Sequence, residues 1–193
     1  MDNSKTVLLL LIEFPPLNNA GVYRPMRFIN ALVENGYTPI IVTIDNATYY
    51  KNFPHKCDVE LENRLPKELI VYKIPFNEKE HQNIYKSSYK SILNIYFSTG
   101  ELIEKTWKKN LFDSLPEIIG KHKPLLLFSS APPFAAAKLA KSISKIYKLP
   151  LLLDMRDAWC KNSITPVASF FHYYAKMLVE RKCFEAASKI ISV

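Results

Sequence analysis

The sequence predicts an α/β fold in which a doubly wound, Rossmann-like parallel sheet carries helices on both faces. Three observations predict it: short apolar segments recur along the 193 residues, longer amphipathic segments separate them, and 48% of the residues are hydrophobic. Strands that alternate with helices of this length are typical of a parallel sheet. The sequence shows no internal repeat or linker, so we expect residues 1–193 to form a single domain.

Six apolar segments are expected to form the strands. The first, Val7–Ile12, is continuously apolar, as in a strand that is buried on both faces. The other five expected strands, in chain order, are Thr38–Ile44, Leu69–Ile74, Leu125–Phe128, Leu151–Asp154 and Lys189–Val193.

Helical spacing of apolar residues predicts the helices between these strands. In Tyr23–Asn35 the apolar residues recur every three or four positions, Pro25 suits the first helical position, and Gly36 suits the end. The other expected helices are His81–Phe97, Glu101–Lys121, Phe134–Tyr147 and Pro166–Ala187.

Charge and cysteine content limit the class of protein. Twenty-six Lys and Arg against eighteen Asp and Glu give a net charge of +8, which favours anionic partners. Nucleic acid is not expected among them, because no helix-turn-helix, zinc or ribonucleoprotein signature occurs. Three widely spaced cysteines suggest no disulfide framework or zinc site, so we expect a cytoplasmic, reducing location. The longest apolar run is too short for a membrane span and does not resemble a signal peptide.

Ligands of an open doubly wound sheet bind beyond the carboxyl ends of its strands. Three chemically unusual loops are expected there: Glu13–Tyr23, Ser129–Pro133 and Asp154–Asn162. None of them matches a dinucleotide-binding or P-loop motif, and the chain has only four glycines to build such loops.

The first loop leads into a helix that could bind an anion. Asn19 and Gly21 both tolerate positive φ. Arg24 and Arg27 are three residues apart and share a helix face, where cations near the N-terminus oppose the macrodipole. A bound phosphate or carboxylate would explain this arrangement. Arginines that pair with nearby carboxylates of the protein would explain it equally well, and both interpretations stay open.

The third loop places Asp154, Arg156 and Asp157 at the end of a strand. Arg156 could hold a carboxylate or phosphate with two hydrogen bonds, and a carboxylate could position a hydroxyl or act as a base. The alternative is an ion-pair cluster that fixes the loop.

In the second loop, Ser129 and Ser130 could bind a sugar or phosphate, or simply cap a helix.

The remaining candidates concern metals and membranes. The four histidines show no metal spacing, and we expect no metal site. Lysines recur along one predicted helix, and aromatic residues alternate with lysines in Tyr85–Phe97 and Phe170–Lys182. These features suit either solvated and core-facing helix surfaces or contact with an anionic membrane. The lysine positions are Lys138, Lys141, Lys145 and Lys148.

Four segments, in this order, resemble one family. They are Phe14-Pro15-Pro16 through Ala20-Gly21-Val22, Arg24-Pro25, Arg27-Phe28 and Gly36-Tyr37-Thr38-Pro39; Ser129-Ser130-Ala131-Pro132-Pro133; Leu149-Pro150 with Asp154-Met155-Arg156-Asp157-Ala158-Trp159; and Glu180 with Ala186–Val193. Together they resemble the N-terminal domain of GT-B glycosyltransferases of family four, most closely a bacterial subgroup that builds surface polysaccharide. The resemblance is least distinctive over Tyr50–Lys123.

The resemblance implies a retaining transferase, usually independent of metal and without a cofactor, that moves a sugar from a nucleotide-sugar to a glycan or lipid-linked acceptor. Gly21, Arg24 and Arg27 would serve the donor phosphate. Acceptor-side positions would be Asn19, Ser130, Asp154 and Arg156, and Asp157 would be catalytic. The donor-binding C-terminal domain would be absent, so we expect these 193 residues alone to be inactive.

Two departures from the family pattern qualify this expectation. Asn18-Asn19 stands where the family usually has Gly-Gly, and Phe134 and Ala137 stand where it often has His. The sequence also leaves two alternatives: a stand-alone, non-catalytic α/β binding module, possibly peripheral to a membrane, and a flavodoxin-like cofactor binder. The second has no recognisable phosphate loop to support it.

Overall fold

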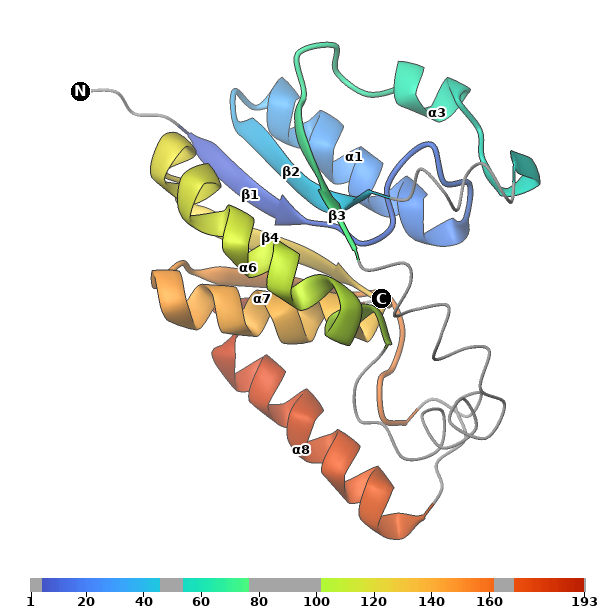
Figure 1. Ribbon diagram of the computed structural model, residues 1–193, viewed down its shortest axis with the longest axis vertical. Helices are drawn as coiled ribbons and strands as arrows, with labels where there is room; N and C mark the ends of the chain where they lie inside the picture. Colours follow the sequence, from blue (N-terminus) through green and yellow to red (C-terminus); the bar gives the residue numbers. More distant parts are fainter. Residues whose placement is uncertain (1–4, 46–53, 77–101, 162–168, 193) are drawn as a thin grey trace.

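A computed structural model describes residues 5–45, 54–76, 102–161 and 169–192 (Figure 1). Within these ranges six parallel strands form one sheet in the order β3-β2-β1-β4-β5-β6, which confirms the predicted fold class. Each predicted strand is present, with ends that differ by at most three residues. The strands are β1 (Thr6–Leu10), β2 (Thr38–Asp45), β3 (Ile70–Pro75), β4 (Leu126–Ala131), β5 (Leu151–Met155) and β6 (Lys189–Ser192).

The helices also follow the predicted pattern. The main ones are α1 (Ala20–Glu34), α6 (Leu102–His122), α7 (Phe134–Tyr147) and α8 (Phe170–Ala186). A 3₁₀ turn (Pro54–Lys56) and the short α3 (Glu60–Asn63) were not predicted, because single turns carry no periodic apolar signal. The predicted helix His81–Phe97 lies outside the described residues, as do the first residues of Pro166–Ala187.

The start of α1 differs from the prediction. Asn19 is the N-cap, and its side-chain oxygen accepts a hydrogen bond from the backbone N–H of Gly21 at 3.0 Å. Pro25 therefore lies inside the helix, and its predicted place at the first helical position was wrong. The Asn side chain satisfies a free N–H of the first turn, so the helix begins earlier than Pro25 indicated.

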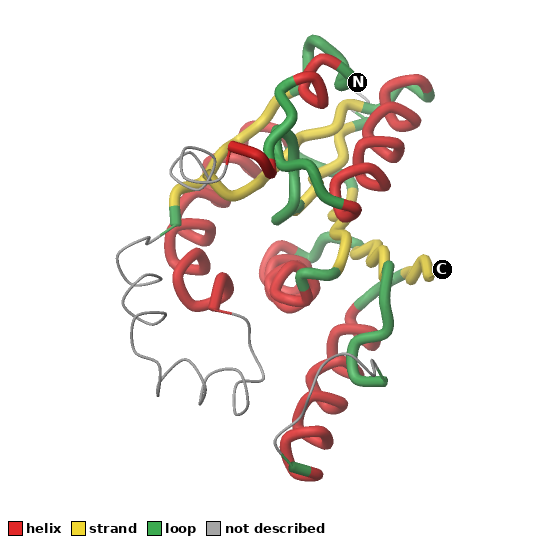
Figure 2. Tube along the Cα trace, turned by 90° about the vertical axis from the view of Figure 1, so that its right-hand side faces the viewer, coloured by secondary structure: helices red, strands yellow, loops and turns green. Residues whose placement is uncertain are grey.

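Both faces of the sheet are buried by helices, as the continuously apolar first strand predicted. Leu8 and Leu10 point into a core shared with α6 and α7, whereas Val7 and Leu9 point into a second core shared with α1. Figures 1 and 2 show α1 and α6 on opposite sides of the strands. Trp107 of α6 is fully buried, and its indole N–H donates to the Ile74 carbonyl at 3.0 Å.

The order in which successive strands join the sheet reverses at β1, which pairs with β2 on one side and with β4 on the other. This is the topological switch point of a doubly wound sheet, where loops diverge and leave a crevice for ligands. The carboxyl ends of β1, β4 and β5 are neighbours there, so the three unusual loops meet at one edge.

Candidate functional site

The ends of β1, β4 and β5 are joined by hydrogen bonds at the carboxyl edge of the sheet. The Ser129 hydroxyl donates to the Leu10 carbonyl at 3.1 Å, and the Arg156 backbone N–H donates to the Ala131 carbonyl at 2.8 Å. These bonds hold the three strand ends in register, so side chains of the loops have fixed starting points.

Asp154 is the centre of a buried polar cluster. Its side chain has no exposed surface, and it lies on β5, which is apolar on either side of it. Arg24 binds it with Nη2 2.7 Å from Oδ1 and with Nε donating at 2.9 Å. The Ser130 hydroxyl donates to Oδ2 at 2.8 Å. A buried carboxylate needs such partners, and the contacts join α1, β4 and β5 at the crevice.

Glu13 is the centre of a second cluster. Its Oε2 lies 2.8 Å from Nη2 of Arg156, and its Oε1 accepts a hydrogen bond from the Asn19 side chain at 2.8 Å. Nε of Arg156 is buried and has no hydrogen-bond partner among the described residues. Sequence reasoning noted Glu13 only as the start of a loop. A carboxylate placed directly after a buried apolar strand was the available signal.

Gly21 lies directly beneath the second cluster. A Cβ at this position would lie 1.6 Å from Oε2 of Glu13 and 2.5 Å from Nη1 of Arg156. The absence of a side chain at Gly21 therefore leaves room for the ion pair between Glu13 and Arg156. The expected role of Gly21 in binding a donor phosphate stays a prediction.

The two arginines of α1 have different surroundings. Arg24 is bound to Asp154, which is the alternative in which a carboxylate of the protein holds the arginine. Arg27 is exposed and has no ion pair with any described residue. Asp157, the expected catalytic residue, is also exposed and forms no hydrogen bond or ion pair with a described residue. These two side chains are thus open to a ligand.

Residues 54–58 support the first loop through backbone contacts, and the sequence did not predict this support. The Asn18 N–H donates to the Lys56 carbonyl and the Asp58 N–H to the Pro16 carbonyl, each at 2.8 Å. Leu17 and Cys57 form an antiparallel bridge between these contacts. The loop that carries Asn19 and Gly21 is therefore supported on its outer side.

Phe134 and Trp159 cover the second and third loops. Their rings stack with centroids 4.8 Å apart and planes 2° from parallel. Phe134 occupies a position where the resembling family often has His, so the ring there supplies apolar contact.

Cys160 follows Trp159 in the chain. Burial and the neighbouring carboxylate of Glu180 raise the pKa of the Cys160 thiol to about 12. This thiol is neutral at physiological pH.

Two kinds of feature are absent from the described ranges, a metal-binding cluster and a membrane-spanning helix. No group of three or more His, Cys, Asp or Glu side chains there is arranged to hold a metal ion. No helix in those ranges combines the length and apolarity required to cross a bilayer.

Comparison with known proteins identifies the fold. No family model matches the chain, and no curated protein matches it. The structure of spinosyn rhamnosyltransferase SpnG complexed with thymidine diphosphate is 12% identical, with a TM-score of 0.52 over 97% of this chain and 44% of that one. MurG of Acinetobacter baumannii is 10% identical, with a TM-score of 0.49 over 97% of this chain and 41% of that one. The chain thus spans less than half the length of either structure, and it has the Rossmann-like α/β fold found in GT-B glycosyltransferases.

Proposed function

We propose that this chain is the N-terminal, acceptor-side domain of a sugar-nucleotide glycosyltransferase. The observation that carries the proposal is the pair of polar clusters at the switch point of the sheet, where Arg24–Asp154 and Glu13–Arg156 lie at the strand ends. The likeness of fold to a rhamnosyltransferase supports it, since that enzyme was solved with a nucleoside diphosphate. A nucleotide-sugar would be the donor, bound mainly by a second domain, and a glycan or lipid-linked glycan of surface polysaccharide would be the acceptor.

The proposed roles follow from exposure. Asp157 is exposed at the strand end and would act on the acceptor hydroxyl as a base or by positioning it. Arg27 would face the donor diphosphate as the exposed cation of α1. Asp154 has no exposed surface, so its part on the acceptor side would run through Ser130 and Arg24.

The second cluster would shape the acceptor side of the crevice. Asn19 and Arg156 are both held by Glu13, and the unpartnered Nε of Arg156 leaves this guanidinium with unused donor capacity. Gly21 would keep the backbone of α1 close to this pair and to the donor phosphate. No cofactor or metal is part of the proposal. A cytoplasmic location suits the three cysteines, which are all free thiols.

The direct test is sugar transfer by a protein that contains both domains. We expect transfer from a nucleotide-sugar, and we expect Arg156→Ala to weaken acceptor binding. A folded two-domain protein that neither hydrolyses nor transfers any nucleotide-sugar tried, and in which Arg156→Ala changes no ligand affinity, would contradict the proposal. Binding of a glycan without transfer would instead favour the non-catalytic module.

Retention of anomeric configuration is a further part of the proposal, and it is supported by the sequence resemblance alone. The anomeric configuration of the first product, followed by NMR before mutarotation, tests it. A product of inverted configuration would leave the transferase proposal standing and exclude a retaining mechanism.

A further inference from the structure

Helix α8 carries an apolar stripe that nothing in the described structure covers. Its members recur at spacings of one, three and four residues, which places them on one side of an α-helix. Phe170 and Phe171 are 76% and 81% exposed, and the three that follow are 37–50% exposed. The stripe consists of Phe170, Phe171, Tyr174, Met177 and Leu178.

The opposite side of the same helix already packs on the protein. Cys183 is fully buried and Val179 packs against the main core, in contact with α7. In Figure 1, α8 extends away from the sheet beyond α7. The stripe is therefore not used in packing against the described residues, and exposed apolar surface of this kind marks an interaction site.

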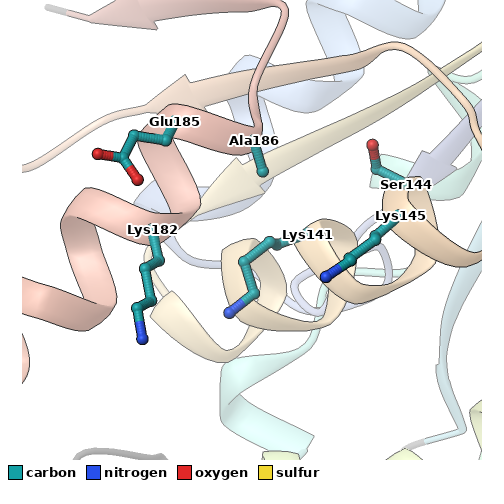
Figure 3. Close-up of a pocket in the computed structure, with 6 residues that line it drawn as sticks. All are labelled: Lys141, Ser144, Lys145, Lys182, Glu185 and Ala186. Carbon is teal, nitrogen blue, oxygen red and sulfur yellow. The ribbon is translucent and has the colours of Figure 1, made fainter.

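A basic pocket lies beside the C-terminal end of α8. It has a volume of about 570 Å³ and is lined by Lys141, Ser144, Lys145, Lys182, Glu185 and Ala186. Figure 3 shows that α7 and α8 both contribute side chains to it. The three lysines form no ion pair with any described residue. Glu185, the one carboxylate, accepts a hydrogen bond from Arg181 at 2.7 Å. Three lysines against one carboxylate give the pocket lining a net positive charge.

The pocket is separate from the crevice at the carboxyl edge of the sheet. Helix α7 begins after β4 at that edge and ends before β5, at the opposite edge. Ser144 lies near the end of α7, where its hydroxyl donates to the Leu149 carbonyl at 2.7 Å. Glu185 and Ala186 are the last residues of α8 before the amino end of β6. A ligand here would not occupy the proposed transfer site.

We propose that the apolar stripe and the basic pocket form one docking surface for an anionic lipid bilayer. The aromatic and aliphatic side chains would enter the boundary between headgroups and acyl chains, and the lysines would bind headgroup phosphates. Charge complementarity selects this occupant. A second copy of the chain would also carry a charge of +8, and the two copies would repel each other. Anionic lipid headgroups carry the opposite charge and would be attracted.

The experiment measures binding of the 193-residue chain to vesicles by flotation. We expect binding to phosphatidylcholine vesicles that contain phosphatidylglycerol, and much weaker binding to phosphatidylcholine alone. Lys141→Gln/Lys145→Gln/Lys182→Gln should weaken binding on the order of 100-fold, since each lysine near an anionic surface adds about fivefold. The control Lys5→Gln/Lys56→Gln/Lys67→Gln removes the same charge from exposed positions away from α7 and α8, and should weaken binding far less.

A second pair of variants tests the stripe. Phe171→Ser/Tyr174→Ser should abolish the part of the binding that survives high salt, because salt screens the lysines and leaves the apolar contact. Val59→Ser/Leu125→Ser changes two apolar residues that are 70% and 56% exposed elsewhere, and should have no such effect. All substituted positions are partly or fully accessible, and circular dichroism checks that each variant folds.

Three results would overturn the proposal. The chain could fail to bind anionic vesicles, or the two lysine variants could lose affinity equally, which would show only diffuse charge. A dimer that Phe171→Ser/Tyr174→Ser dissociates, in a chain that binds no vesicle, would assign the stripe to a second copy. No sugar or nucleotide enters these measurements, so their outcome is independent of the proposed transferase activity.

Discussion

Arg24 of α1 binds Asp154 of β5 with Nη2 2.7 Å from Oδ1, although 130 residues separate the two in the chain. The pair crosses the switch point of the sheet and joins a helix on one side of β1 to a strand on the other. A buried carboxylate at the end of a parallel strand needs a cation or several hydrogen-bond donors. Arg24 and Ser130 supply both, so these contacts fix α1, β4 and β5 relative to one another at the switch point.

Asp154→Asn should destabilise the protein strongly. The amide has no charge for Arg24 to neutralise. Its NH2 group also replaces a carboxylate oxygen that accepts a hydrogen bond from Arg24 or Ser130. Loss of one partner of a buried pair costs roughly 3–5 kcal/mol. The Arg24 side chain is 32% exposed, which places this change near the lower end of that range. Urea unfolding measures it. The control Asp113→Asn breaks an exposed pair with Lys109 and should change the free energy of unfolding by less than about 0.5 kcal/mol. Equal effects of the two substitutions would contradict this account.

Gly21→Ala should destabilise the protein, although alanine is the better helix former by about 1 kcal/mol. The new Cβ would displace the Glu13 carboxylate, which Arg156 and Asn19 hold from two sides. Forcing an atom into such a site costs about 1–3 kcal/mol. Gly120→Ala is the matched control, because nothing lies within 4 Å of a Cβ there and the residue is also helical. Gly120→Ala should be neutral or stabilising in thermal unfolding. A neutral Gly21→Ala would show that Glu13 moves freely.

The fold could be predicted because its signals are local. The continuous apolar run of β1 indicates burial on both faces, and the structure places Leu8 and Leu9 in two different cores. Phe134–Tyr147 was predicted with the bounds that α7 has, since alanine and leucine recur there at helical spacing. Pro25 gave the wrong start for α1, because a proline signal and the Asn19 cap conflict and only the tertiary structure decides between them.

The site could be predicted only to the level of its loops. The carboxyl edge of a parallel sheet gathers them, so their residues were identified without knowledge of their partners. Which carboxylate binds which arginine depends on the strand order and on side chains far apart in sequence. Glu13 belongs to a pair with Arg156 across 143 residues, and no pattern along the chain encodes that contact.

Cys160 should resist alkylation at neutral pH. Burial and the Glu180 carboxylate raise the pKa of its thiol from 9.0 to about 12, and only the thiolate reacts. In a Cys57→Ser/Cys183→Ser background, labelling by iodoacetamide should rise about tenfold per pH unit above pH 9 and level off near pH 12. Since the folded pKa is the higher one, the stabilisation from the neutral thiol is complete below pH 9 and is lost as the pH rises to 12. Rapid labelling at pH 7.5 would contradict the burial of this thiol.

Arg27→Ala should weaken binding of a nucleoside diphosphate to the two-domain protein without changing its stability. The side chain is exposed and forms no ion pair with a described residue, so its removal breaks no internal contact. A charge-assisted hydrogen bond to a phosphate is worth about 1.5–3 kcal/mol, or roughly 10–150-fold in affinity. Arg64→Ala, at an exposed position beside α3, is the control for loss of one positive charge. Calorimetric titration compares them, and equal affinities of the two variants would remove Arg27 from the donor side.

Asp157→Asn should lower sugar transfer by the two-domain protein by about 10²–10⁴-fold, the usual contribution of a positioned acid or base. The carboxylate is exposed and forms no hydrogen bond or ion pair with the described part of the chain, so the free energy of unfolding should change by less than about 0.5 kcal/mol. Glu34→Gln removes an equally exposed carboxylate at the far end of α1 and should leave transfer unchanged. The decisive measurement is kcat at saturating acceptor, because loss of binding alone raises KM and leaves kcat unchanged. An unchanged kcat would show that Asp157 takes no part in the chemical step, and the search for the base would then move to Glu13, the carboxylate that pairs with Arg156.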